Sequence, residues 1–205
     1  MQQSRSRPRI VIVHPFDPLG EKYGGIESVL RVLLRQWVSR FDILVVGTSS
    51  DTSSRPVGRC TTIAIEEGTY SVLPVMREQS VWNRVPGFPT GAFLLSVKHS
   101  LRKLDLTEST LFCQKVEVAW ALTATRAKRK VLWVHGTSRF LNNPLGRPSA
   151  LRVALTNRLE AKVLRSLDRV LLVSQALLRT YRTQYTSYAY KFGYLPPFVD
   201  LPYMN

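Results

Sequence analysis

Hydrophobic residues follow two patterns that alternate along this chain. Short continuous apolar runs, such as 10–13 and 41–47, are rich in Val and Ile. Between these two runs, apolar residues from Ile26 to Trp37 recur at three- and four-residue spacing. Continuous runs are typical of parallel strands buried on both faces, and the wider spacing is typical of an amphipathic helix. The chain therefore opens with a predicted strand, helix and strand.

The same alternation continues to the C-terminal region, with one irregular segment. Residues 70–89 mix apolar and basic side chains and contain three prolines, so no regular element is predicted there. The alternation predicts an α/β fold, a Rossmann-like three-layer α/β/α domain with a mainly parallel sheet of about six or seven strands. The remaining predicted strands are 61–65, 111–113, 130–134, 169–173 and 192–195, and the remaining helices are 91–104, 116–125, one starting near Pro148, and 175–185 capped by Ser174.

The charge balance is unusual for a domain of 205 residues. Lys and Arg number 29 against 14 Asp and Glu, which gives a formal net charge of +15. Such an excess indicates a polyanion nearby, either nucleic acid or an anionic membrane surface. No helix-turn-helix, RNA-recognition or zinc pattern accompanies the charge, so nucleic acid is the least favoured partner.

The membrane relation predicted from the sequence is peripheral. No apolar run approaches the ~20 residues of a spanning helix, and no signal-peptide core follows the basic residues 1–8. A cytoplasmic protein lying at a membrane is expected. Basic side chains interleaved with aromatic rings are typical of an interfacial contact, but an ordinary solvated basic helix face explains them equally well. The membrane-contact candidates are Trp82, Arg84, Phe88, Lys98, Arg102 and Lys103.

Cysteine and acidic residues give no sign of a metal centre. Cys60 and Cys113 are far apart and each is flanked by strand-like residues, so both are expected to be core thiols in a reducing compartment. No His, Cys or Asp cluster has the spacing of metal ligands, so neither a metal nor another cofactor is predicted.

Candidate chemistry lies where predicted strands end. Gly24 and Gly25 precede the first helix, where unpaired N–H groups suit a phosphate; a simple tight turn is the alternative, because neither a dinucleotide fingerprint nor a P-loop is present. His135 and Gly136 follow the strand 130–134, and His14 follows the first strand. Ligands of open α/β sheets bind beyond such carboxyl ends. The alternative is that each histidine is structural and makes its hydrogen bonds to neighbouring loops.

Four segments, in this order and spacing, resemble the N-terminal half of retaining GT-B glycosyltransferases of family four. They are GGIE at 24–27, HG at 135–136, LEAKVLRSLDRVLLVS at 159–174 and YLPPFVDLPYM at 194–204. The resemblance implies that His135 is the catalytic residue near the reacting sugar. It also implies that Gly24, Gly25 and Glu27 form the loop for the donor phosphate and the acceptor, with His14, Gly136, Thr137 and Ser174 as further site candidates.

The resemblance also implies a domain plan and a function. Residues 1–8 are read as a basic tail, 9–196 as the acceptor-side domain and 197–205 as the start of a linker, in which Pro197-Phe198 replaces the usual Asn-Gly. The family's nucleotide-sugar site lies mainly in a C-terminal donor-binding domain that these residues do not include, so little transfer is expected from this chain alone.

The implied reaction moves a sugar from a nucleotide-sugar donor to a lipid-linked or polysaccharide acceptor, at the cytoplasmic face of a membrane. The nucleotide sugar is a co-substrate, and no cofactor is implied. A non-catalytic subunit that recruits a separate catalytic half to the membrane is the alternative, and a nucleic-acid-binding protein is the least favoured reading.

Overall fold

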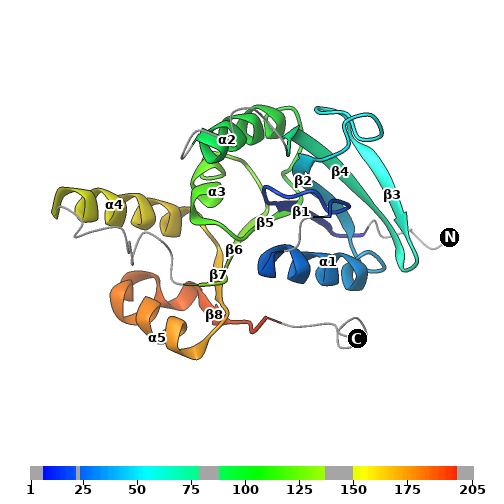
Figure 1. Ribbon diagram of the computed structural model, residues 1–205. Helices are drawn as coiled ribbons and strands as arrows, with labels where there is room; N and C mark the ends of the chain where they lie inside the picture. The colour runs from blue at the N-terminus through cyan, green and yellow to red at the C-terminus, as the bar shows by residue number, and fades with distance from the viewer. Residues whose placement is uncertain (1–6, 22–23, 79–87, 137–149, 198–205) are drawn as a thin grey trace.

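The computed structural model describes residues 7–21, 24–78, 88–136 and 150–197, without the side chains of 88–90 and 150–157. Its strands are β1 (Arg9–Val13), β2 (Asp42–Ser49), β3 (Thr61–Ile65), β4 (Gly68–Arg77), β5 (Ser109–Cys113), β6 (Arg129–Val134), β7 (Arg169–Leu172) and β8 (Phe192–Tyr194). They form one sheet in the order β3-β4-β2-β1-β5-β6-β7-β8 (Figure 1). Every neighbouring pair is parallel except β3 and β4. The predicted α/β class is confirmed, with a strand more than expected.

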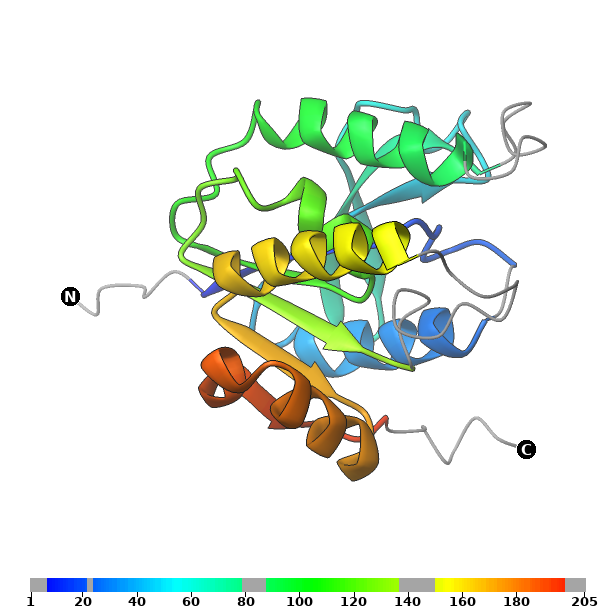
Figure 2. The same ribbon diagram turned by 90° about the vertical axis from the view of Figure 1, so that its left-hand side faces the viewer.

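Helices cover both faces of this sheet, unequally. The helices are α1 (Gly25–Trp37), α2 (Phe88–Leu101), α3 (Val116–Ala121), α4 (Ala150–Ser166) and α5 (Gln175–Gln184), followed by the 3-10 helix η2 (Thr186–Lys191). Helix α1 lies on one face, and α2, α3 and α4 lie on the other (Figures 1 and 2). This arrangement is the predicted three-layer α/β/α order.

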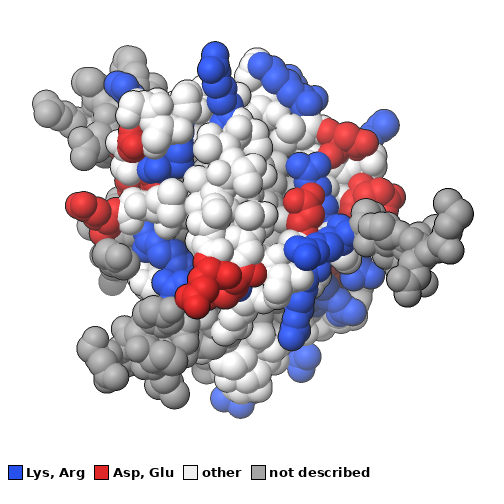
Figure 3. Space-filling view, turned by 90° about the vertical axis from the view of Figure 1, so that its right-hand side faces the viewer, with Lys and Arg blue, Asp and Glu red and all other residues white. Residues whose placement is uncertain are grey.

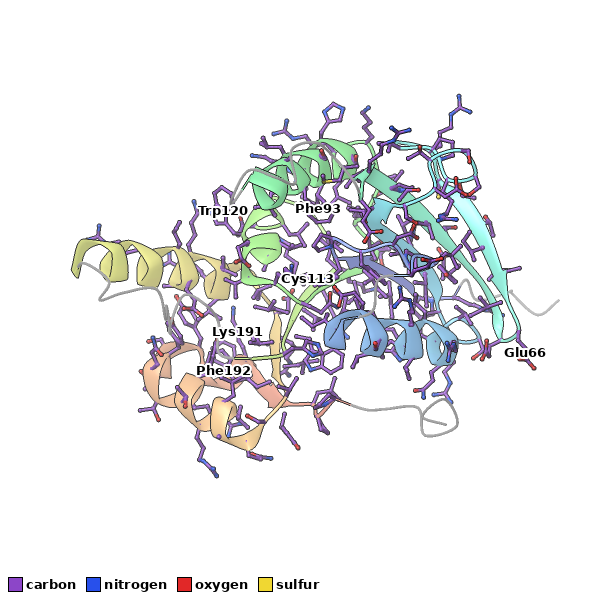
Figure 4. The ribbon with its side chains drawn as sticks, viewed as in Figure 1. Glu66, Phe93, Cys113, Trp120, Lys191 and Phe192 are labelled. Atoms are coloured by element: carbon purple, nitrogen blue, oxygen red, sulfur yellow. The ribbon has the colours of Figure 1, made fainter. Side chains whose placement is uncertain are left out.

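The two cores follow the alternation of side chains along β1. Ile10 and Ile12 pack with α1, whereas Val11 and Val13 pack with α2 and α3. Figure 4 shows Phe93 on the inner side of α2. Because both faces of β1 are covered, its whole length is apolar, which is why the strand appears in the sequence as a continuous run.

Strand β4 corrects the sequence prediction, since residues 70–77 were expected to be irregular. Its one internal proline, Pro74, lies at a register shift: Gly47 pairs with Pro74, while Thr48 pairs with Met76. A bulge of this kind accommodates a residue that has no N–H to donate. The Pro74 carbonyl accepts a hydrogen bond from Gly58 N at 2.8 Å. The prediction was wrong because proline was taken as a strand breaker without allowance for a bulge.

Helix boundaries differ from the predicted ones by a few residues. Helix α2 begins and ends three residues earlier than expected, and α3 ends at Ala121 rather than at residue 125. In α4, Val163 is buried but Leu159 is 37% exposed. The N-cap prediction is confirmed, because Ser174 Oγ accepts from Leu177 N at 3.1 Å.

The two cysteines differ in environment. Cys113, at the end of β5, is buried, as predicted, and burial raises the pKa of its thiol to about 12. Cys60 is exposed, which contradicts the prediction of a core thiol. It precedes β3, an edge strand whose residues are only half-buried at best. Strand-like neighbours therefore did not mean burial at Cys60. Both thiols are free in this structure.

Charge is mixed on the face that carries β3. Figure 3 shows Lys and Arg there interspersed with Asp and Glu, around a central strip without charged side chains. The positive excess is therefore not gathered into one continuous patch on this face.

Candidate functional site

The candidate site lies at β1, the strand from which the chain adds later strands first on one side and then on the other. β1 has β2 on one side and β5 on the other, and the helices that follow β1 and β5 lie on opposite faces. Open α/β sheets bind ligands at the carboxyl ends of strands at such a switch point. His14 directly follows β1, Gln114 follows β5 and His135 follows β6. The structure thus brings the two predicted histidines to one edge of the sheet.

His14 is fully buried without a hydrogen bond. Its side chain has 0% exposure, and neither ring nitrogen has a hydrogen-bond partner within the described residues. Nε2 lies 3.6 Å from Glu27 Oε1, which is longer than a hydrogen bond. Burial lowers the pKa of His14, against an opposing effect of Glu27. The ring is therefore neutral at pH 7, with two polar atoms unused by the fold.

Glu27 lies in the first turn of α1, beside His14. The interaction with His14 lowers the pKa of Glu27 to about 2, so the carboxylate is charged at physiological pH. A negative charge is also favoured by the positive end of the helix dipole. A Cβ added at Gly24 would collide with this carboxylate, whereas one added at Gly25 would meet nothing within 4 Å. At Gly24 the group that approaches the backbone is therefore Glu27 itself.

His135 is a second neutral histidine at this edge. Its ring lies 4.1 Å from the Trp133 ring between centroids, at an interplanar angle of 54°. Burial, together with the nearby His14, lowers the pKa of His135 to about 4. Nε2 is buried without a hydrogen-bond partner among the residues described. The Trp133 ring that contacts His135 is held in place, because Trp133 is fully buried and its Nε1 donates to the Leu195 carbonyl at 3.1 Å.

Gln114 and Lys115 were missed by the sequence analysis. Gln114 is 5% exposed, and both polar atoms of its amide lack partners within the described part of the chain. The positive charge of half-buried Lys115 contributes to lowering the pKa of both His14 and Glu27. A signal was available, since these residues follow the predicted strand 111–113 as His14 follows the first.

A buried ion pair fixes the loop that follows His14. Asp17 is 2% exposed, and its Oδ2 accepts from Arg55 Nη2 at 2.8 Å and from Ser50 N at 2.8 Å. Burial raises the pKa of Asp17, but the hydrogen bonds from Ser50 and Arg55 outweigh it, so the pKa is lowered overall. Arg31 of α1 donates to the carbonyls of Pro18 and Gly20. Residues 17–20 are therefore held by Ser50 and Arg55 on one side and by Arg31 on the other.

The other residues predicted for the site either make no hydrogen bond to His14 or His135 within the described part of the chain, or lie outside it. Ser174 lies at the carboxyl end of β7, where its hydroxyl caps α5. Gly136 is exposed, and a Cβ there would meet nothing within 4 Å. Thr137, Trp82, Arg84 and the side chain of Phe88 lie outside the described residues.

Lys98 is exposed in the C-terminal half of α2, and Arg102 and Lys103 are exposed just beyond its end. None of them belongs to the strand ends that carry His14 and His135, which we call the histidine edge. Within the described ranges, no group of three or more His, Cys, Asp or Glu residues could hold a metal ion.

Comparison with solved structures identifies the fold. Sucrose-phosphate synthase from Thermosynechococcus elongatus is similar with a TM-score of 0.62 and 14% identity, over 93% of this chain and 48% of that one. The catalytic domain of starch synthase IV from Arabidopsis thaliana, bound to ADP and acarbose, gives 0.58 and 11%, over 96% and 52%. An α,α-trehalose-phosphate synthase (UDP-forming) from Burkholderia vietnamiensis gives 0.57 and 16%, over 93% and 48%.

These similarities establish the fold and its extent. No protein-family model matches the sequence, and no curated protein matches it either. The chain has the α/β fold of GT-B glycosyltransferases, and it spans about half the length of the solved structures it matches. The predicted resemblance to one half of a GT-B glycosyltransferase is thus confirmed at the level of the fold.

Proposed function

We propose that this chain forms the acceptor-side half of the active site of a retaining glycosyltransferase of family four. In this proposal a sugar passes from a nucleotide-sugar donor to a lipid-linked or polysaccharide acceptor, at the cytoplasmic face of a membrane. The donor's nucleotide would bind mainly to a C-terminal domain that follows these residues.

One observation carries the proposal: several buried polar groups that have no partner among the described residues lie together at the switch point. An unpaired buried polar group costs ~1–3 kcal/mol, and folded proteins rarely leave several together. His14, Gln114 and His135 do so at the carboxyl ends of the strands, where open α/β sheets bind ligands. Hydroxyl groups of a sugar would supply a donor or an acceptor to half-buried His135, whereas His14 and Gln114, 0% and 5% exposed, would be affected indirectly.

The charge states suit a neutral sugar that leaves an anionic phosphate. Neutral His135 can donate or accept one hydrogen bond from a sugar hydroxyl, and the Glu27 carboxylate can accept another. Lys115 and the open start of α1 at Gly25 favour the departing phosphate. The residues act by position and charge, and no pair of carboxylates is assigned as nucleophile and acid.

Binding can be tested on the histidine rings, because the whole sequence contains three histidines. Proton–nitrogen spectra of the three side chains would be recorded during titration with UDP-glucose, ADP-glucose and glucose 6-phosphate. We expect the signals of His14 and His135 to shift in a saturable way, while exposed His99 on α2 serves as the internal control. Unchanged His14 and His135 signals with every sugar ligand would contradict the proposed site.

Catalysis is tested with the protein that includes the donor-binding half. His135→Ala should lower the turnover of its nucleotide sugar by about a hundredfold, the effect of losing one polar group aimed at the reacting sugar. His99→Ala is the matched control and should leave turnover unchanged. The anomeric configuration of the first-formed product, read by NMR, tests retention. Equal turnover in both variants, or an inverted product, would refute the corresponding part of the proposal.

The membrane part rests on the exposed side of α2. Lys98, Arg102 and Lys103 are exposed there, and Leu95 is 72% exposed beside them. No helix in the described ranges is both long and apolar enough to cross a bilayer. Co-sedimentation with neutral and anionic vesicles across a salt series is the test. We expect binding to anionic vesicles that weakens as salt rises; binding without any sugar response of His14 and His135 would favour the membrane-recruiting subunit instead.

A further inference from the structure

An apolar groove lies beside α2, on the side of the sheet opposite α1. It has a volume of about 580 Å³ and is lined by residues of α2, the segment 57–60, β2 and β4. Leu44 of β2 and the β4 residues Leu73 and Val75 line it from the sheet. Leu95 and Leu104 line it from the helix side.

The walls of the groove expose large aliphatic side chains to solvent. Leu95 is 72% exposed and Val57 is 44% exposed, one on each side. Apolar surface of this kind is stabilised when a hydrocarbon replaces the water against it. Small-molecule sites share these properties, with ~300–1,000 Å³ of mainly apolar surface and a few polar groups that fix orientation.

The polar groups of the groove are cationic. Arg9 and Lys103 line it with His99, and no Asp or Glu is among its described lining residues. Arg9 Nε is buried without a hydrogen-bond partner and lies 3.5 Å from Asp42 Oδ2, an ion pair whose side chains are 39% and 58% exposed. Lys103 has no ion pair among the described residues. The cationic side of the groove is therefore complementary to an anionic group.

The groove is separate from the candidate sugar site. Arg9 is the first residue of β1 and pairs with Asp42, the first residue of β2, so this part of the groove lies at the amino ends of the strands. His14 and His135 follow the carboxyl ends of β1 and β6. Since all these strands are parallel, the Arg9 end of the groove and the two histidines lie toward opposite ends of the strands.

We infer that the groove binds a dispersed single-chain anionic amphiphile. Its hydrocarbon chain would lie between Leu95 and Val57, and its anionic head would pair with Arg9 and Lys103. The inference does not depend on the proposed sugar site, because it uses neither His14 nor His135, but it shares Leu95 and Lys103 with the proposed membrane contact.

The exposed thiol of Cys60 lines the groove and provides the assay. Cys113, the other cysteine in the sequence, is buried with a thiol pKa of about 12 and will not compete for reagent. The rate of Cys60 alkylation by neutral N-ethylmaleimide would be measured with dodecyl phosphate below its critical micelle concentration. We expect saturable protection of about tenfold or more. Neither dodecyl maltoside, which lacks the charge, nor inorganic phosphate, which lacks the chain, should protect comparably.

Variants test the assigned contacts. Lys103→Gln should raise the concentration of dodecyl phosphate that gives half-maximal protection by about tenfold, as expected for a lost charge-assisted hydrogen bond. Leu95→Asp should abolish protection, because it places a carboxylate against the chain. Lys162→Gln, an exposed lysine on α4, is the control and should bind as the unchanged protein does.

Three results would overturn the inference. Equal protection by dodecyl maltoside would remove the anionic specificity. Protection by anionic vesicles alone would replace the dispersed amphiphile with a bilayer surface. Alkylation that slows as protein concentration rises, without any lipid, would make the occupant a second copy of the chain.

Discussion

Two regions of this protein bury ionisable side chains, and they do so in opposite ways. At the switch-point edge, His14 and Gln114 are buried with polar atoms that have no hydrogen-bond partner within the described residues. At the corner formed by α4, α5 and η2, Glu160 and Lys191 are just as buried, but each has several partners. The buried polar groups of the corner are satisfied within the fold, whereas those of the switch-point edge can still make hydrogen bonds.

Two buried ionisable side chains, with five hydrogen bonds between them and their partners, close the corner. Glu160 of α4 accepts hydrogen bonds from Tyr181 Oη at 3.1 Å and from Tyr185 Oη at 2.5 Å. Lys191 Nζ donates to the carbonyls of Leu164, Arg165 and Leu167 at 2.9, 3.1 and 2.5 Å. A lysine there satisfies the last carbonyls of α4 and complements its dipole. Figure 4 shows Lys191 and Phe192 together in this corner, apart from Cys113 in the centre.

The difference indicates how to separate structural from functional burial. A polar group that the fold satisfies stabilises the fold, and removing it should mainly lower stability. A polar group that the fold leaves unsatisfied lowers stability, so its presence calls for another reason, of which ligand binding is one.

The largest effect is expected at Lys191. Lys191→Met should lower the free energy of unfolding by about 3 kcal/mol, because three buried carbonyls lose a charged donor. Urea denaturation monitored by circular dichroism measures this change. Lys162→Met, on the exposed side of α4, is the control and should change it by less than ~0.5 kcal/mol. Similar losses in both variants would mean that the corner does not depend on the Lys191 contacts.

Glu160 should show the next largest effect. Glu160→Ala removes the acceptor of two tyrosine hydroxyls and should lower the free energy of unfolding by about 2 kcal/mol. Glu160→Gln keeps one acceptor oxygen and should lose less at neutral pH. If the alanine variant were as stable as the unchanged protein in the same urea titration, the corner would not be a satisfied network.

Gln114 provides the opposite test at the edge. Gln114→Leu replaces an unpaired buried amide with an apolar side chain of similar size, so the free energy of unfolding should stay the same or rise by up to ~1 kcal/mol. The same variant should weaken the shift of His14 signals by sugar ligands. A loss of stability comparable to that of Glu160→Ala would show that Gln114 has a structural partner, and the comparison between the two regions would fail.

The smallest expected effect is a difference in pH dependence. Burial lowers the pKa of His14 and His135 below 6.5, so the unfolded chain takes up their protons first as pH falls, and the free energy of unfolding decreases. Burial raises the pKa of Glu160 above 4.5, so the folded protein takes up that proton first, and stability increases as pH falls through the raised value.

Variants separate these two contributions between pH 7 and 4. His135→Asn should lose part of the destabilisation on acidification, and Glu160→Gln should lose the opposing stabilisation. Urea midpoints measured at several pH values would compare them. Parallel pH profiles for the two variants would contradict the assigned directions.

Local pattern predicted most of the fold, and pairing between distant segments explains what it missed. Continuous runs at 10–13 and 130–134 are apolar because both faces are covered, and that signal needs no tertiary information. Pro74 in β4 and the exposed position of Cys60 depend on strands that pair across the sheet, so the sequence around them gave the wrong prediction.

The residues of the candidate site were predicted from their positions after strands in the sequence, and not from contacts between their side chains. His14 and His135 were located by strand ends, a rule that applies equally to Gln114 and Lys115 but was not applied to them. That Gly24 makes room for Glu27, and that Trp133 supports His135, follow only from side-chain geometry. No spacing in the sequence encodes these contacts.

The central position of β1 also bears on how the chain folds during synthesis. One edge of β1 pairs with β2, nearby in sequence, but the other pairs with β5, so Arg9 meets Ser109. At ~5–20 residues per second, the ribosome needs roughly 5–20 s to make the intervening segment. During that interval an apolar strand of the sheet has an unpaired edge, which is a site for aggregation. Strand β1 is therefore completed only after β2 and β4, although it precedes both in the chain, and the interval before β5 is made is when the nascent chain is most open to aggregation.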